Sequence, residues 1–280
     1  MYKRQTKDWL YLKTYTGSAD DVGATLPVLV AWMNQLSGVE CWHFIRYMDF
    51  QGHHLRIRLK GYTNDVDAWY TTLPMLRKSL KAVSPQKMER IIFDPMTGQV
   101  GSRRGVTLDV YSPELEKYGG LEGMKHVEQH FQDSSLACTY MRIWNWGAQK
   151  RAVQVAHYIS AVQNNLVNMN IEMNLPYMIA DRWRTRLVYA GISPQKLNEK
   201  ISDISVKLQI SNTFLEPKLC DVAASSAELI RKYVCGEIVA PQNFPLDIVH
   251  MDINRIGLNP LEECFAAMLA AQKDSSSNAD

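Results

Sequence analysis

Cationic residues occupy every second position of a short run whose remaining positions are aliphatic. The cationic set is His54, Arg56, Arg58 and Lys60, and the aliphatic set is Leu55, Ile57 and Leu59. Because side chains of a strand alternate between its two faces, the two sets are expected on opposite faces. Neighbours on one face lie about 6.6 Å apart, so two guanidinium groups can hold one small dicarboxylate between them. The alternative is an ordinary solvated strand face opposite a packed one.

This run forms the second arm of a predicted β-hairpin. The first arm covers residues 42–50, and Asp49 together with Gly52 is typical of a short turn between two arms. Arg46 lies on the first arm. The pattern leaves two roles open for it, which are lining the same site as the arginines and bracing the neighbouring strand.

The elements around the hairpin indicate an α+β fold. Further strands are predicted at Trp9–Tyr15, Met88–Phe93 and Val106–Tyr111, and helices at about 26–36 and 66–80. This predicts a mostly antiparallel sheet with helices in the N-terminal half and a largely helical C-terminal half. We expect a single domain over residues 1–273, with a sheet-containing part at about 1–120 and a helical part at about 121–273. Residues 274–280 are polar and small, which predicts a disordered tail.

Composition excludes several classes of function. The net charge of +2 and the 21% of charged residues argue against bulk electrostatic binding of nucleic acid. The five cysteines lack C-x-x-C spacing, so neither a zinc site nor a disulfide framework is indicated. The polar N-terminus is unlike a secretory signal, and no apolar run approaches the roughly 20 residues that span a bilayer. We therefore expect a cytoplasmic protein without a membrane contact.

The sequence contains no motif that requires an organic cofactor, such as a phosphate-binding glycine loop. His126 and His130 are four residues apart on a predicted helix, a spacing compatible with a pair of metal ligands. No third ligand accompanies them in the sequence. We therefore interpret both as histidines on a helix surface, and we expect neither a metal nor an organic cofactor.

Three stretches carry a family resemblance: R-Y-x-D at 46–49 followed by H-L-R-I-R-L-K at 54–60, Y-S-P-E-L-E-K-Y-G-G at 111–120, and H-M-D-I-N-R at 250–255. Together they resemble the C-terminal domain of class I lanthipeptide dehydratases, a fold family that also occurs in thiopeptide biosynthesis. The resemblance runs from Trp9 to the C-terminus. The second stretch departs from the family at Lys117, where an arginine is usual, and lysine keeps the charge but loses the bidentate fork.

The resemblance implies a lyase that acts on a ribosomally synthesised precursor peptide. Such an enzyme eliminates glutamate from glutamylated Ser or Thr and leaves dehydroalanine or dehydrobutyrine. The implied catalytic residues are His250, Arg56, Arg58 and Lys117, and the candidate substrate-binding residues are Arg46, His54 and Arg255. We expect the hairpin cations and the imidazole to meet over one cavity. The histidine would take the α-proton or protonate the leaving group, and the sequence leaves both roles open.

The resemblance also implies partners and alternatives. A separate glutamyl-tRNA-dependent protein is expected to glutamylate the precursor peptide, and a homodimer is left open. One alternative is a thiopeptide pyridine synthase, which joins two dehydroalanines in a formal 4+2 macrocyclisation. Another is a module that recruits a precursor peptide without catalysis.

Overall fold

The computed structural model describes residues 6–86, 88–98, 104–193, 195–199, 202–203 and 214–277. Its strands form one antiparallel sheet in the order β2-β3-β1-β4. The strands are β1 (Lys7–Tyr15), β2 (Cys41–Asp49), β3 (Gly52–Tyr62) and β4 (Gly105–Asp109). This confirms the predicted fold class for the N-terminal half. The predicted hairpin is β2 with β3, and Gly52 at its turn has a φ of 116°, a conformation that favours glycine.

The two faces of the sheet differ as the alternation predicts. Leu55, Ile57 and Leu59 are each 0% exposed and pack in one cluster with α1 (Val22–Met33) and α2 (Thr63–Lys81). Because β2 pairs with β3 in antiparallel register, Arg46 lies opposite Leu55 and therefore on this face. The neighbouring residue Ile45 lies opposite Arg56 and therefore on the other face.

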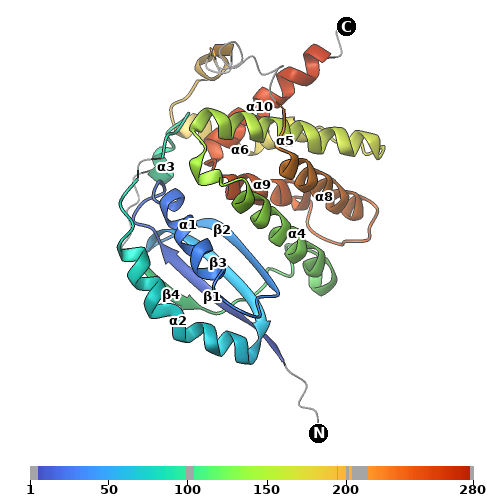
Figure 1. Cartoon of the computed structure of the whole chain (residues 1–280). Helices are drawn as coiled ribbons and strands as arrows, with labels where there is room; N and C mark the ends of the chain where they lie inside the picture. The colour runs from blue at the N-terminus through green and yellow to red at the C-terminus, as the bar shows by residue number, and fades with distance from the viewer. Residues whose placement is uncertain are drawn as a thin grey trace.

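The C-terminal half is helical, as expected. After α3 (Pro95–Gly98) and β4 come α4 (Gly120–Tyr140), η1 (Ile143–Asn145), α5 (Ala148–Asn168), α6 (Leu175–Tyr189), α8 (Pro217–Val234), α9 (Phe244–Ile256) and α10 (Pro260–Ser277). Helices α4 and α9 contact β2, which is an edge strand of the sheet, while α10 packs on α5 and α6 farther from it (Figure 1). Packing against α9 therefore places C-terminal residues beside the hairpin.

Two segments differ from the sequence predictions. Residues 88–93 form an irregular segment instead of a strand, because its backbone bonds to the start of α10. The Ile91 N–H donates to Glu262 at 2.9 Å, and the Ile92 carbonyl accepts from Asn259 at 2.8 Å. Helix α10 continues to Ser277, into the segment expected to be disordered, since no Gly or Pro interrupts it after Pro260. Residues 278–280 lie outside the described residues.

Among the described helices, none combines the length and apolar composition needed to cross a bilayer.

Candidate functional site

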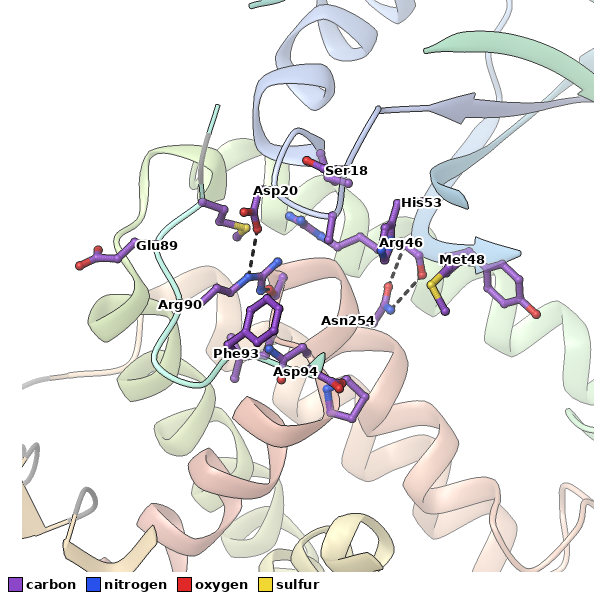
Figure 2. A pocket seen from close by; sticks show the side chains of 18 of the residues that line it. Ser18, Asp20, Arg46, Met48, His53, Glu89, Arg90, Phe93, Asp94 and Asn254 are labelled. Atoms are coloured by element: carbon purple, nitrogen blue, oxygen red, sulfur yellow. Dashed lines mark hydrogen bonds and ion pairs between the residues drawn. The ribbon is translucent and has the colours of Figure 1, made fainter. Parts of the chain in front are cut away.

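A cavity of about 890 Å³ opens where the turn end of the hairpin meets the helical half. Its wall combines residues from β2 and β3, from the irregular segment at 88–94, from α6, and from α9 with the turn that follows it. Figure 2 shows these walls and the polar side chains that reach into the space between them. Residues from both halves of the chain thus share one cavity.

His250 contributes an imidazole whose orientation is held by a buried carboxylate. Its Nδ1 lies 2.7 Å from Oε2 of Glu263, which is 1% exposed. Because a carboxylate accepts hydrogen bonds, Nδ1 is the donor in this contact, which leaves Nε2 for another group. Within the described residues Nε2 has no hydrogen-bond partner, and His250 lines the cavity. The pair can therefore act as a base toward a group bound in this cavity.

Asn254 brings the hairpin to His250. Its side chain pairs with the backbone of Arg46 on the edge strand, since Oδ1 accepts from the N–H at 2.8 Å and Nδ2 donates to the carbonyl at 3.0 Å (Figure 2). Asn254 lies four residues after His250, so both side chains project from the same side of α9. The Asn254 amide therefore makes the two backbone hydrogen bonds that a neighbouring strand would make with Arg46 at the edge of the sheet. Arg46 and His250 line the same cavity.

The guanidinium of Arg46 is incompletely satisfied. Its Nε donates to the carbonyl of Arg255 at 3.4 Å, while Nη1 is buried without a hydrogen-bond partner in the described structure. Burial, reinforced by the neighbouring cations Arg90 and Arg151, lowers the pKa of Arg46 to about 9. Gly257 allows the close approach of this group, since a Cβ there would lie 2.9 Å from Cζ of Arg46.

The other hairpin arginines lie on the opposite face of the sheet and do not line the cavity. The guanidinium carbon of Arg56 lies 3.4 Å from the ring centroid of Tyr47, a residue that does line it. Arg58 packs over Tyr111 at 4.6 Å, and its Nη1 lies 3.3 Å from Nε2 of His43. The expected convergence of these two arginines with His250 over one cavity is therefore corrected: the hairpin supplies Arg46, because register places alternate residues on opposite faces.

The remaining candidates, Lys117 and His54, lie outside the lining of the cavity. Lys117 Nζ is 3.7 Å from a carboxylate oxygen of Asp247, one turn before His250 on α9. His54 is 0% exposed, and its Nδ1 is 3.1 Å from the carbonyl of Gly52. Burial, opposed by this hydrogen bond and by Asp49, lowers the pKa of His54, which favours the neutral ring.

Arg255 has a structural position that corrects its expected contact with substrate. It is 0% exposed, and its guanidinium donates to the carbonyls of Phe44 at 2.9 Å and Met251 at 3.0 Å. These bonds satisfy the edge of β2 and the interior of α9. A buried residue with such partners fixes the helix against the strand, and Arg255 does not line the cavity.

A further correction concerns His130, which is buried and not on a helix surface. Its Nε2 lies 3.0 Å from Oδ2 of Asp252, an oxygen that also accepts from Tyr158 at 2.6 Å and Ser226 at 2.9 Å. Burial raises the pKa of Asp252, but His130 and Arg255 outweigh it and hold that pKa at about 2. This network ties four helices together. Across the described residues, no group of three His, Cys, Asp or Glu has the geometry of a metal site.

Comparison with known proteins identifies the family. The profile of the family described as "Lantibiotic biosynthesis dehydratase C-term" matches residues 9–273. The chain belongs to this family. No curated protein sequence matches the chain.

Two solved structures share the fold of this dehydratase C-terminal family with the chain. One is the tRNA-dependent lantibiotic dehydratase MibB from Microbispora sp. 107891, at 18% identity and a TM-score of 0.57, with 100% of this chain and 29% of that chain covered. The other is TbtD, a pyridine synthase from thiomuracin biosynthesis, at 12% identity and a TM-score of 0.57, with 97% and 98% covered. The chain thus spans less than a third of MibB and almost the whole of TbtD.

Sequence reasoning on this dehydratase C-terminal domain missed several residues of the cavity. Asn254 lies inside the H-M-x-x-N-R stretch, so its place in that pattern was a usable signal. Glu263 had no such signal, since only the packing of α10 beside α9 brings it to His250. Arg90 and Arg186 belong to segments far apart in sequence that meet only in the folded cavity.

Proposed function

We propose that the protein eliminates glutamate from glutamylated Ser or Thr residues of a ribosomally synthesised precursor peptide. The products are dehydroalanine or dehydrobutyrine and free glutamate. The observation that supports this most directly is the His250 imidazole, which lines a cavity with its Nδ1 bound to buried Glu263. A member of the dehydratase C-terminal family that carries such a base has the group the reaction requires.

The chemistry is a β-elimination that needs no covalent enzyme intermediate. Nε2 of His250 takes the α-proton, the electron pair forms the Cα–Cβ double bond, and the Cβ–O bond breaks to release the glutamate carboxylate. Glu263 stabilises the imidazolium that forms, because the carboxylate already lies 2.7 Å from Nδ1. Negative charge that develops on the substrate is stabilised by cations placed beforehand in the cavity wall.

The proposal gives the outlying candidates secondary roles. Arg56 stacks on Tyr47, which lines the cavity, and Lys117 contacts Asp247, one turn before His250 on α9. We propose that they hold the peptide flanking the reacting residue. A role for Arg58 in the reaction is proposed only because the family resemblance implies it.

The proposal also requires a glutamylated substrate. MibB is described as a tRNA-dependent dehydratase, and this chain covers only 29% of it. As the family resemblance implies, we propose that a separate glutamyl-tRNA-dependent protein supplies the glutamylated precursor, and that the present chain does not itself contact nucleic acid.

The experiment is to incubate a glutamylated peptide with the protein and to follow its mass. Loss of the complete glutamate with formation of a dehydrated residue supports the proposal. His250→Ala should leave glutamylated peptide accumulating, with a rate at least about 100-fold lower, the contribution expected of a general base. His126→Ala is the matched control, since His126 is exposed on α4. Equal rates for His250→Ala and the unaltered protein would refute the role of His250.

A second candidate function is the formal 4+2 macrocyclisation of two dehydroalanines. The observation that favours it is the match with the pyridine synthase TbtD over 98% of that chain, together with Lys117 at the position where the family resemblance expects arginine. A peptide that already contains dehydroalanines separates the two proposals. Its conversion to a pyridine-containing macrocycle, with no glutamate release from the glutamylated peptide, would replace elimination by this second function. No change in either peptide would favour a recruiting module.

A further inference from the structure

We propose that Arg46 is the carboxylate-binding residue of the cavity and recognises the free carboxylate of the glutamyl group. This inference rests on the proposed function for the identity of the natural ligand. The chemical class of the ligand, a small carboxylate, follows from the surroundings of Arg46 alone. The specificity residue would then come from the edge strand β2 and not from the H-L-R-I-R-L-K run of β3.

The first argument is that Arg46 lacks a negative partner. No carboxylate of the described residues lies within 4.0 Å of its guanidinium, and its Nη1 is buried without a hydrogen bond. A shielded cation without a counter-ion is costly, because burial removes water and nothing replaces it. A ligand carboxylate in the cavity that Arg46 lines would supply the missing charge.

The second argument is that the other cavity arginines are already neutralised. Arg90 lies 3.4 Å from Asp20 and 3.1 Å from Glu262. Arg186 lies 2.7 Å from Asp94, which is 2% exposed. A ligand carboxylate would have to compete with these internal acids, whereas Arg46 has no such competitor in the described part of the cavity. Arg46 is therefore the favoured guanidinium for an incoming anion.

The third argument is that Arg46 is preorganised. Its backbone is fixed at both N–H and C=O by Asn254, its Nε is held by the carbonyl of Arg255, and its guanidinium lies against Gly257. Few rotamers are then left to freeze on binding, which favours affinity. Asn254 also lies one turn after His250 on the same side of α9. The position of the carboxylate site relative to the base is therefore fixed, and selection for one acyl group requires such a fixed position.

The arginines on the opposite face share the first feature, since Nε of Arg56 and Nε of Arg58 are also buried without a hydrogen bond in the described structure, but both are held away from the cavity. Arg56 is stacked on Tyr47, and Arg58 is enclosed by Tyr11, Tyr111 and His43. Neither guanidinium lines the cavity. These contacts hold the two side chains to the sheet, so among the described arginines that line the cavity Arg46 is the one without an acidic partner.

The binding experiment uses glutarate, a five-carbon dicarboxylate, with neutral glutaramide as the comparison ligand. Calorimetry on the full chain should show glutarate binding and no glutaramide binding. Arg46→Gln should weaken glutarate about 10- to 100-fold, the effect of losing a charge-assisted hydrogen bond. Arg46→Lys should keep part of the affinity, because it retains the charge without the fork. Arg184→Gln, an exposed change on α6, is the matched control and should bind like the unaltered protein.

The outcomes separate this inference from the proposed function. Glutarate affinity that is lost in Arg46→Gln supports the carboxylate site even if no elimination is observed in the peptide assay. Affinity that survives in Arg46→Gln, Arg46→Lys and Arg184→Gln alike overturns the inference while leaving elimination intact. Loss of affinity in Arg58→Gln but not in Arg46→Gln also overturns it, since the binding cation would then lie on the other sheet face. Circular dichroism of each variant confirms folding, and Arg46→Lys provides the test if Arg46→Gln fails to fold.

Discussion

Replacing Glu263 with glutamine should separate the chemical role of this residue from its role in packing. The amide oxygen of glutamine can accept the same hydrogen bond from Nδ1 of His250, so ring orientation and substrate binding should be retained. The change removes only the negative charge that faces the imidazolium during proton transfer. We therefore expect kcat to fall while KM stays nearly constant.

The size of the effect follows from the geometry. With Oε2 2.7 Å from Nδ1, the two charge centres are about 4 Å apart, and at an effective dielectric constant of about 20 their attraction is roughly 4 kcal/mol. Only part of the imidazolium charge has developed at the transition state, so we expect a loss of about 2–3 kcal/mol. This corresponds to a decrease in kcat of roughly 30- to 150-fold.

The assay is single-turnover release of glutamate from a glutamylated peptide, followed by mass spectrometry. Glu263→Asp should recover part of the rate, because it restores the charge at a shorter reach. The thermal midpoint should be unchanged or higher in Glu263→Gln, since the 1% exposed carboxylate no longer has to be desolvated. Glu122→Gln, an exposed change on α4, serves as the control. An unaltered kcat in Glu263→Gln, or a raised KM at constant kcat, would refute the reasoning.

Three further predictions concern the supports of the site. Gly257→Ala should destabilise the protein by at least about 1 kcal/mol and weaken glutarate binding, because its φ is 108° and a Cβ would lie 2.9 Å from Arg46; calorimetry and thermal melting check this. Asn254→Ala should cost about 1–3 kcal/mol, since it leaves the backbone N–H of Arg46 unpaired, and a loss of stability without loss of elimination would contradict its positioning role. Asp252→Asn should cost about 3–5 kcal/mol by breaking the buried pair with His130, as measured by denaturant unfolding. The pKa of Asp252 is about 2, below the ordinary value of 3.8, so its ionised carboxylate contributes about 2 kcal/mol to the free energy of unfolding. This contribution is present above pH 4 and is lost as the pH falls toward 2. Acid unfolding at the same pH in Asp252→Asn and in the unaltered protein would contradict this.

Local pattern was sufficient to predict the hairpin and its two faces. The period of two in His54–Lys60 correctly separates Leu55, Ile57 and Leu59 from the cationic residues, because side-chain alternation is a property of any strand. Helical periodicity after residue 121 likewise predicted the character of the C-terminal half. The strand predicted at Met88–Phe93 was wrong, because its backbone groups bond to α10 residues about 170 positions away.

The candidate site was predictable in its components and not in its arrangement. The stretch H-M-D-I-N-R identified His250, and the R-Y-x-D stretch contained Arg46. Which hairpin arginine enters the cavity depends on the side of the edge strand against which α9 packs, and no pattern within the strand encodes that choice. Glu263 is a similar case, since its closeness to His250 depends on the docking of α10 beside α9.

The sequence by itself determined the family, the strand faces and the candidate for a base, because each depends on residue type and spacing along the chain. Only the tertiary structure decided that Arg46 and Asn254 share a cavity with His250 and that Glu263 contacts His250, while Arg56 and Arg58 lie across the sheet. The physical reason is that contacts between distant segments depend on how whole faces of strands and helices pack together. A shift of one residue in strand register would place a different set of side chains at the cavity.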